Sequence, residues 1–410
     1  MKKIIVLSAL LPLICANNVF ADGGVSDEAS LMQAIAEANA NPNIKKIRFE
    51  EDAHIVLNQP VVYSGTQDLV LVGHGATIDG ASAGSFVLDQ DLTAVTEDGT
   101  FVFNTAASIT IKNLSVLNSA TRGIVVNIPE DAVGGDQVVN LHKVVVRNSA
   151  LYGLHIDDNR DEFDDGNFGS AIGLELNISK SSFTFNGIGA LDFDGIRVDE
   201  RGDGDIITTI RQSVISDNGG DGIELDEAGR GDVITTVIDT IIDRNGFYNA
   251  EDYDDGFDID EGDEGSIWVN MIGVSAADNK DEGLDFDEAG AGSVNISVLD
   301  TEVSGSGDEG LKVDEADDGD INFALKNVES EENGDDGIQF TEQGAGQIFG
   351  SLTGVEAEDN AKYGVTIGQW IVEDEPAPAE AAGQVSASDV ELSGNASGDI
   401  VKLNNVDLVQ

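Results

Sequence analysis

The segment Asp221-Gly222-Ile223-Glu224-Leu225-Asp226-Glu227 decides the fold, because close copies of it recur through the middle of the chain. Each copy has an acidic residue, a glycine, and then an apolar–polar–apolar alternation that ends in a polar pair. The copies begin at residues 194, 221, 255, 282, 309 and 336, so successive copies lie 27 residues apart except for one step of 34. The longer step contains an insert around 247–253, which indicates a loop that leaves the repeat unchanged on either side.

Each repeat has the same order of turns and strands after this segment. In the repeat that begins at Asp221, Gly231 lies in a polar turn, and residues 233–238 alternate as a strand does. Short strands and turns at constant positions favour pairing of each strand with its copy in the next coil. The sequence therefore predicts an all-β fold, a right-handed parallel β-helix that forms a three-sided solenoid of 27-residue coils.

An asparagine or serine closes each repeat. The regular members of this series are Asn218, Asn245, Asn279, Ser306, Asn333 and Asn360. Stacked asparagine side chains can hydrogen-bond from one layer to the next. We therefore expect a ladder of amides along one turn of the solenoid.

The two ends of the chain have their own patterns. Residues 1–21 combine Lys2 and Lys3, an apolar stretch and a small-residue site before Asp22, which predicts a cleavable signal peptide and a secreted or periplasmic protein. This stretch is too short to predict a membrane span. The only cysteine, Cys15, lies within it, so neither a disulfide nor a cysteine metal site is expected in the rest of the chain.

Residues 22–410 are expected to form a single β-helix domain. Ser26, followed by Leu31, Ile35 and Ala38 at helical spacing, predicts a short amphipathic helix at about 27–40 that caps the first coil. The regular acidic repeats occupy about 194–346, and a Pro/Ala/Glu-rich loop is expected at about 373–382.

Two segments near the start of this domain resemble a known family. Residues 30–49 and the segment 71–80, Leu-Val-Gly-His-Gly-Ala-Thr-Ile-Asp-Gly, resemble the first coils of secreted right-handed β-helix proteins of the pectin-lyase-like superfamily. The resemblance implies the fold, but this superfamily has many functions, so no single reaction follows from it.

The charge of the chain restricts its partners. There are 78 acidic and 21 basic side chains, giving a formal net charge of −57. Such a charge excludes nucleic acid and anionic membrane surfaces as partners and favours divalent cations. An extracellular polysaccharide or a cell-surface partner is compatible with secretion.

The acidic residues of the repeats are expected to stack in columns. Alternation directs the residue between the two apolar positions, and the Asp that follows, to the outside of the solenoid, about 4.8 Å from their copies in the next coil. Stacked carboxylates repel one another by about 1 kcal/mol even in water. Ca²⁺ would relieve this repulsion, since it accepts six to eight oxygen ligands in flexible geometry. The candidate ligands are Asp199, Glu224, Asp226, Asp258, Asp260, Asp285, Asp287 and Asp314.

Two functions and one simpler interpretation remain open from the sequence. The leading hypothesis is a secreted protein that binds Ca²⁺ or similar cations along this face and has a structural or adhesive role. The alternative, which the resemblance permits, is a calcium-dependent polyuronate lyase that uses Arg197, Arg201, Arg230 or Lys312 as its base. The Arg-Pro signature of pectate lyases is absent, however. The simpler interpretation is an acidic surface that is merely solvated.

Overall fold

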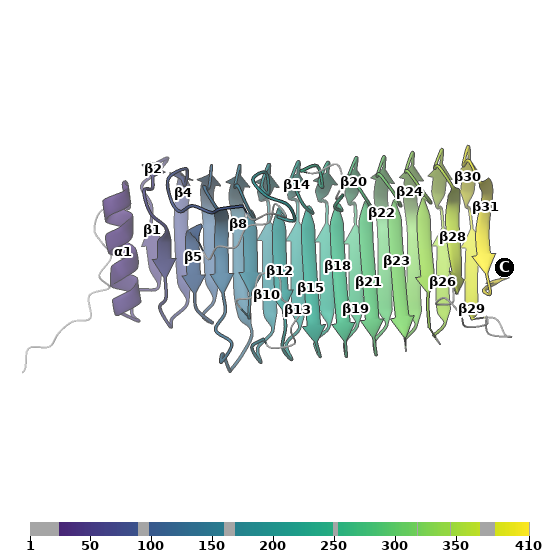
Figure 1. Ribbon diagram of the computed structural model, residues 1–410, viewed down its shortest axis with the longest axis horizontal. Coiled ribbons are helices and arrows are strands. Elements are labelled where there is room, and N and C mark those ends of the chain that lie inside the picture. The colour runs from purple at the N-terminus through teal and green to yellow at the C-terminus, as the bar shows by residue number, and fades with distance from the viewer. Residues whose placement is uncertain are drawn as a thin grey trace, which may run out of the picture.

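The chain forms a long stack of parallel coils in the computed structural model (Figure 1). The structure describes residues 24–88, 98–159, 169–248, 253–317, 319–344, 346–369 and 382–409. All strand pairs are parallel, and each strand pairs with its counterpart in the neighbouring coil, as β15 does with β12 and β18. The predicted parallel β-helix is therefore confirmed. The predicted signal peptide and most of the predicted loop at 373–382 lie outside the described residues.

One side of the stack is a 12-stranded sheet. Its strands are β3 (Val61–Tyr63), β5 (Gly99–Asn104), β7 (Arg122–Asn127), β9 (Leu154–Asp157), β12 (Ile196–Glu200), β15 (Ile223–Gly229), β18 (Phe257–Asp263), β21 (Leu284–Gly290), β23 (Leu311–Asp317), β25 (Ile338–Glu342), β28 (Tyr363–Gln369) and β31 (Gly398–Asn404).

The other two sides of the stack belong to one 20-stranded sheet. We call the part of this sheet on each side a limb. The first limb contains β1 (Lys46–Arg48), β10 (Leu174–Ser179), β13 (Ile206–Arg211), β16 (Val233–Ile238), β19 (Ile267–Ile272), β26 (Ile348–Thr353), β29 (Gly383–Ser388) and β32 (Asp407–Val409). The second limb contains β2 (His54–Val56), β11 (Ser182–Thr184), β14 (Val214–Ser216), β17 (Ile241–Asp243), β20 (Ser275–Ala277), β27 (Glu356–Glu358) and β30 (Glu391–Ser393). Long strands continue through both limbs, namely β4 (Leu69–Asp79), β6 (Ile109–Leu117), β8 (Gln137–Arg147), β22 (Val294–Ser304) and β24 (Ile321–Glu331).

The core is a set of apolar columns inside the coils. In β21 the inward side chains are Leu284 and Phe286, which are fully buried, and they stack between the inward residues of β18 and β23. Phe257 and Phe286 meet edge to face, with ring centroids 5.9 Å apart. Because each coil buries its apolar side chains against those of its neighbours, the alternation in the repeat fixes which residues face the core.

The predicted asparagine ladder is confirmed. The side-chain amide of Asn218 donates to Asn245 Oδ1 at 2.9 Å, and that of Asn245 donates to Asn279 at 3.1 Å. Ser306 interrupts the side-chain series, but its backbone N–H donates to Asn333 Oδ1 at 3.1 Å. The ladder therefore satisfies buried polar groups at one turn of the solenoid.

Helix α1 (Glu28–Ala40) covers the N-terminal end of the stack (Figure 1). Its N-cap is Asp27, whose carboxylate accepts from the Ser30 backbone N–H at 2.8 Å in a capping box. Leu31, Ile35 and Ala38 are buried against the first coil, which confirms the predicted capping helix. No helix in the described part of the chain is long and apolar enough to cross a membrane.

Candidate functional site: an acidic face on the 12-stranded sheet

The two predicted outward columns are present on the 12-stranded sheet. In strand order from β12 to β23, the first is Arg197, Glu224, Asp258, Asp285 and Lys312, and the second is Asp199, Asp226, Asp260, Asp287 and Asp314. We call the outer surface of β12 to β23 the acidic face. Most of its carboxyl groups are half-buried or buried, not fully solvated, because the stacked neighbours cover one another.

A third acidic column, which the sequence analysis did not identify, lies beside the first. It consists of the acidic residue before each marker glycine: Asp194, Asp221, Asp255, Glu282, Glu309 and Asp336. Within it, Asp194 Oδ1 accepts the backbone N–H of Asp221 at 2.8 Å, and Asp255 Oδ1 accepts that of Glu282 at 2.7 Å. One carboxylate oxygen thus fixes the turn, while the other is available to the acidic face.

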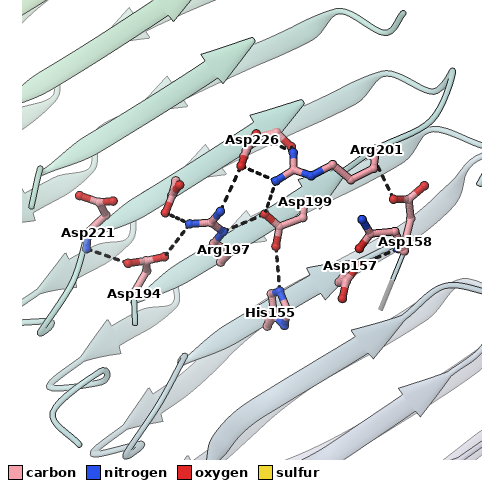
Figure 2. A network of polar contacts seen from close by, with 11 residues as sticks. His155, Asp157, Asp158, Asp194, Arg197, Asp199, Arg201, Asp221 and Asp226 are labelled. Carbon is pink, nitrogen blue, oxygen red and sulfur yellow. Dashed lines mark hydrogen bonds and ion pairs between the residues drawn. The ribbon is translucent and has the colours of Figure 1, made fainter. Parts of the chain in front are cut away.

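The first end of the acidic face is neutralised by arginine (Figure 2). Arg197 lies 2.8 Å from Asp199 through Nε and 3.1 Å from Asp226 through Nη2, and it also pairs with Glu224. Arg201 Nη1 donates to Asp226 Oδ1 at 2.6 Å. Burial disfavours the Asp199 carboxylate, but Arg197, His155 and Arg201 outweigh it and lower the pKa of Asp199.

A buried histidine extends this arginine network (Figure 2). His155 Nε2 lies 2.8 Å from Asp199 Oδ2, and the Tyr152 ring lies over the imidazole at 4.6 Å between centroids. Phe193 packs on Tyr152, also at 4.6 Å, together with Leu151 and neighbouring loop residues. His155 is only 1% exposed, so an external molecule cannot reach it in this structure.

The opposite end of the acidic face is neutralised by a lysine. Lys312 Nζ lies 2.6 Å from Asp285, 3.1 Å from Glu282 and 3.9 Å from Asp287. Burial disfavours the ammonium group, but these three carboxylates raise the pKa of Lys312 above its ordinary value. The side chain is therefore a fixed internal cation.

In the part of the chain that the structure describes, no cationic side chain pairs with the carboxylates at the middle of the acidic face. Among the described residues, no Lys, Arg or His nitrogen lies within ion-pair distance of Asp255, Asp258 or Asp260. Oxygen atoms of Asp255, Asp258 and Asp285 lie within 4.8 Å of one another, as do those of Glu224, Asp258 and Asp260. We call these two groups the central carboxylate cluster.

Burial makes the central carboxylate cluster costly without a cation. Asp285 is 6% exposed, and its Oδ1 has no hydrogen-bond partner among the described residues. Burial, followed by the charges of Asp260, Asp255 and Asp285, raises the pKa of Asp258 well above its ordinary value. Such a group must bind either a proton or a cation at neutral pH.

The predicted ligands therefore divide into two sets. Glu224, Asp258, Asp260 and Asp285 belong to the central carboxylate cluster, in which Glu224 also pairs with Arg197 and Asp285 also pairs with Lys312. Asp199 and Asp226 are occupied by arginine, Asp287 lies near Lys312, and Asp314 belongs to none of the carboxylate groups found in the described chain. Of the predicted bases, Arg230 lies in the turn directly after β15 and pairs with Glu264 at 3.5 Å while remaining exposed.

The final glutamate of each repeat forms a second feature that the sequence analysis did not identify. We call Glu200, Glu227, Glu261, Glu288, Glu315 and Glu342 the glutamate ladder; they are in register and all are buried. They follow the outward Asp, so alternation turns them inward. Strict alternation from Ile223 to Glu227 could have revealed this direction.

The turns after the strands hold the glutamate ladder. Glu200 accepts the backbone N–H groups of Gly202 at 3.1 Å and Gly204 at 3.2 Å. A Cβ atom on Gly292 would overlap the carbonyl oxygen of Gly265 in the preceding coil and crowd the Glu288 carboxyl group. Glycine at this turn position is thus required by the close approach of backbone and carboxyl groups.

In the glutamate ladder, carboxyl oxygens that lack a hydrogen-bond donor face the carboxyl groups of neighbouring members of the ladder. Neither carboxyl oxygen of Glu261 has a hydrogen-bond donor among the other described residues, and the charged groups that act on it are the carboxyls of Glu227, Glu288 and Asp232. Burial, followed by the charge of Glu288, raises the pKa of Glu261 to about 8. Burial is also the main reason that the pKa of Glu315 rises to about 10. Protonated and ionised carboxyls can then hydrogen-bond to one another along the ladder.

Comparison with known proteins identifies the fold. No protein-family model and no curated protein matches the chain. Among solved structures, the A-module of mannuronan C-5 epimerase AlgE4 from Azotobacter vinelandii matches with a TM-score of 0.51 and 14% identity, over 95% of each chain. The periplasmic alginate epimerase AlgG matches with a TM-score of 0.48 and 15% identity, over 94% of this chain and 84% of the other. Pectate lyase Pel9A matches with a TM-score of 0.33 and 14% identity, over 91% and 77%. The match to the AlgE4 A-module therefore shows that the two chains share the right-handed parallel β-helix fold.

Proposed function

We propose that the protein binds divalent cations, with Ca²⁺ as the preferred ion, at the central carboxylate cluster. The observation that carries this proposal is the contrast within one column. Arg197 pairs with Glu224 at one end and Lys312 pairs with Asp285 at the other, whereas Asp258 lies between them with no ion-pair partner among the described residues, and its oxygens converge with those of both neighbours. A bound cation would supply the charge that the chain itself supplies at either end.

The ligand chemistry favours Ca²⁺ over other common cations. All candidate ligands are carboxylate oxygens on adjacent strands or, for Asp255, in the turn before β18, with no histidine or cysteine among them. Ca²⁺ accepts six to eight such ligands in variable geometry, whereas Mg²⁺ requires a near-ideal octahedron at shorter distances. Ligands that are fixed by strand spacing therefore suit the larger and more tolerant ion.

We propose a structural or adhesive role outside the cytoplasm. Cations between coils would join neighbouring repeats and stabilise the stack. This role needs no catalytic group, and the predicted signal peptide would deliver the protein to compartments where Ca²⁺ is abundant. Divalent cations are thus the first proposed partners, and an extracellular polysaccharide or cell-surface molecule would be the second.

Thermal unfolding and calorimetry would test the cation site. We expect Ca²⁺ at millimolar concentration to raise Tm of chelator-treated protein in proportion to the logarithm of its concentration, as mass action requires. Asp258→Asn combined with Asp260→Asn, two residues without an ion-pair partner among the described residues, should abolish most of this response. The double variant should also be more stable than the wild-type protein in chelator, because it removes repulsion between neighbouring carboxylates.

The chain contains a matched control for this experiment. Glu302 and Glu329 stack in register on the second limb but are exposed. Glu302→Gln with Glu329→Gln removes the same formal charge and should leave the Ca²⁺ response intact. If NaCl at matched ionic strength raises Tm as much as Ca²⁺ does, the acidic face is only a solvated surface and the proposal fails.

A second candidate function rests on the buried histidine network. His155 is oriented by Asp199 and lies beside Tyr152, and imidazole and phenol groups can transfer a proton, whereas the neighbouring Arg197 could neutralise a sugar carboxylate. The structural neighbours include enzymes described as alginate and mannuronan epimerases. Activity of this type would require the segment that carries Phe193 to uncover His155. Arg197 and Lys312 are unsuitable bases, because neighbouring carboxylates outweigh burial and raise the pKa of each.

Incubation with polymannuronate or polygalacturonate and Ca²⁺ distinguishes the candidates. We expect neither ultraviolet-absorbing unsaturated ends nor a change in uronate configuration by nuclear magnetic resonance. Turnover that disappears in His155→Gln would establish the second candidate in place of the first.

A further inference from the structure

Between β13 and β29, the first limb of the 20-stranded sheet has an outer surface without acidic residues. From β13 to β29, its outward positions form three columns in register. The columns are Ile207, Ile234, Trp268, Asn295, Asn322, Phe349 and Gln384; Thr209, Thr236, Asn270, Ser297, Ala324, Ser351 and Ser386; and Arg211, Ile238, Ile272, Leu299, Lys326, Thr353 and Ser388. We call this surface the neutral face. Arg211 and Lys326 are its only charged residues, in a chain with 78 acidic side chains.

Two aromatic side chains project from the neutral face. Trp268 is 47% exposed and Phe349 is 37% exposed, although aromatic residues are usually well buried. They belong to one column, and Asn295 and Asn322 lie between them on consecutive strands. The distance from Trp268 to Phe349 along the stack is therefore three strand spacings, or roughly 14 Å.

The surface between the two aromatic residues is a shallow groove. It has a volume of about 480 Å³ and includes Thr236, Asn270 and Ser297 along the neighbouring column. The groove thus combines two apolar platforms with amide and hydroxyl groups at regular spacing. It contains no titratable side chain.

We propose that the neutral face binds an uncharged polysaccharide chain that runs along the solenoid axis. Sugar rings have apolar C–H faces that pack on aromatic rings, and their hydroxyl groups exchange hydrogen bonds with amides and hydroxyls. Tryptophan is suited to such sites because it offers a large contact area at low conformational cost. The two aromatic residues would hold separate sugar units, and the asparagines would contact the units between them.

The net charge of the protein favours an uncharged polysaccharide over anionic ligands on the neutral face. With a formal net charge of −57, the protein repels polyuronates, anionic membranes and a second copy of itself. An uncharged glycan experiences none of this repulsion. The absence of carboxylates from the neutral face also removes strongly hydrated groups that would have to be desolvated on binding.

This binding surface is independent of the proposed cation site, because the neutral face and the acidic face belong to different sheets. Binding of the polysaccharide should therefore persist in chelator under conditions where the protein remains folded. Failure of the cation proposal would leave it unaffected.

Retention on insoluble cellulose and chitin, and affinity electrophoresis in a soluble uncharged β-glucan, would test the proposal with the full chain. We expect retention by at least one of these probes and none by polygalacturonate. Trp268→Ala should weaken binding by about tenfold or more, which corresponds to about 1.4 kcal/mol, and Phe349→Ala should have a smaller effect. Tyr253→Ala, which removes an exposed aromatic residue elsewhere, serves as the matched control.

Three results would overturn the proposal. The first is failure of the folded protein to bind any of the uncharged probes, and the second is unchanged retention in Trp268→Ala. The third is concentration-dependent dimerisation in light scattering that Trp268→Ala abolishes, since this would assign the neutral face to contact between copies. Circular dichroism of each variant confirms that folding is intact, which is expected because Trp268 points away from the core.

Discussion

The acidic face and the neutral face have the same backbone architecture but opposite electrostatic character. Both consist of parallel strands whose outward residues stack in register about one strand spacing apart. On the acidic face this stacking brings carboxylates close together, and Arg197 and Lys312 neutralise those at the two ends. On the neutral face the same stacking joins small polar and aromatic residues into a continuous surface.

The comparison shows that stacking in a solenoid changes the environment of each residue in the repeat. A single outward Asp on an isolated strand would be solvated and unremarkable, but in register with its copies it belongs to a half-buried column. The energetic effect of a residue therefore depends on its neighbours in the adjacent coils more than on its neighbours in sequence.

The largest expected effect comes from removing an internal cation on the acidic face. Arg197→Gln leaves Asp199, Glu224 and Asp226 close together without their shared partner. We expect a loss of about 3 kcal/mol or more in the free energy of unfolding in chelator, as for other broken buried ion pairs. Arg244→Gln removes an exposed pair with Asp217 and should cost less than about 1 kcal/mol. Equal losses in urea denaturation would contradict the importance of burial.

An intermediate effect is expected from the glutamate ladder and depends on pH. The pKa of Glu261 is raised from an ordinary value of 4.5 to about 8, so its contribution to stability is complete below pH 4.5 and is lost as pH rises through 8. Tm in chelator should therefore fall by several degrees between pH 5 and pH 9.

Glu261→Gln provides the test of this pH dependence, because the amide keeps the shape but cannot ionise. The variant should show a smaller decline of Tm with pH than the wild-type protein. Glu329→Gln, which alters an exposed residue, should leave the decline unchanged. An identical slope in the wild-type protein and Glu261→Gln would show that the ladder does not control alkaline stability.

The smallest effect is expected when carboxylates are introduced on the neutral face. Asn295→Asp combined with Asn322→Asp would place two charges on adjacent strands near the surface. The expected cost is about 1 kcal/mol or less, and NaCl should reduce it by screening. A cost as large as that of Arg197→Gln would mean that stacking alone, without burial, accounts for the difference between the faces.

The sequence determined the periodic features of this protein. The spacing of the glycines from Gly195 to Gly337 predicted the coils, and the apolar alternation predicted the register of Glu224, Asp258 and Asp285. It also predicted helix α1 at the N-terminal end. These features follow from local pattern, because in a solenoid each residue is stacked on the residue one period away.

Only the tertiary structure decided which members of a column share a site and which are already neutralised. The ion pairs of Arg201 with Asp226 and of Lys312 with Asp285 depend on how long side chains reach across coils, which the repeat pattern does not specify. The inward turn of Glu261 and the exposure of Trp268 likewise depend on what covers each position. Charge state and accessibility are set by the packing of neighbouring coils and loops, whereas register is set by the period of the sequence.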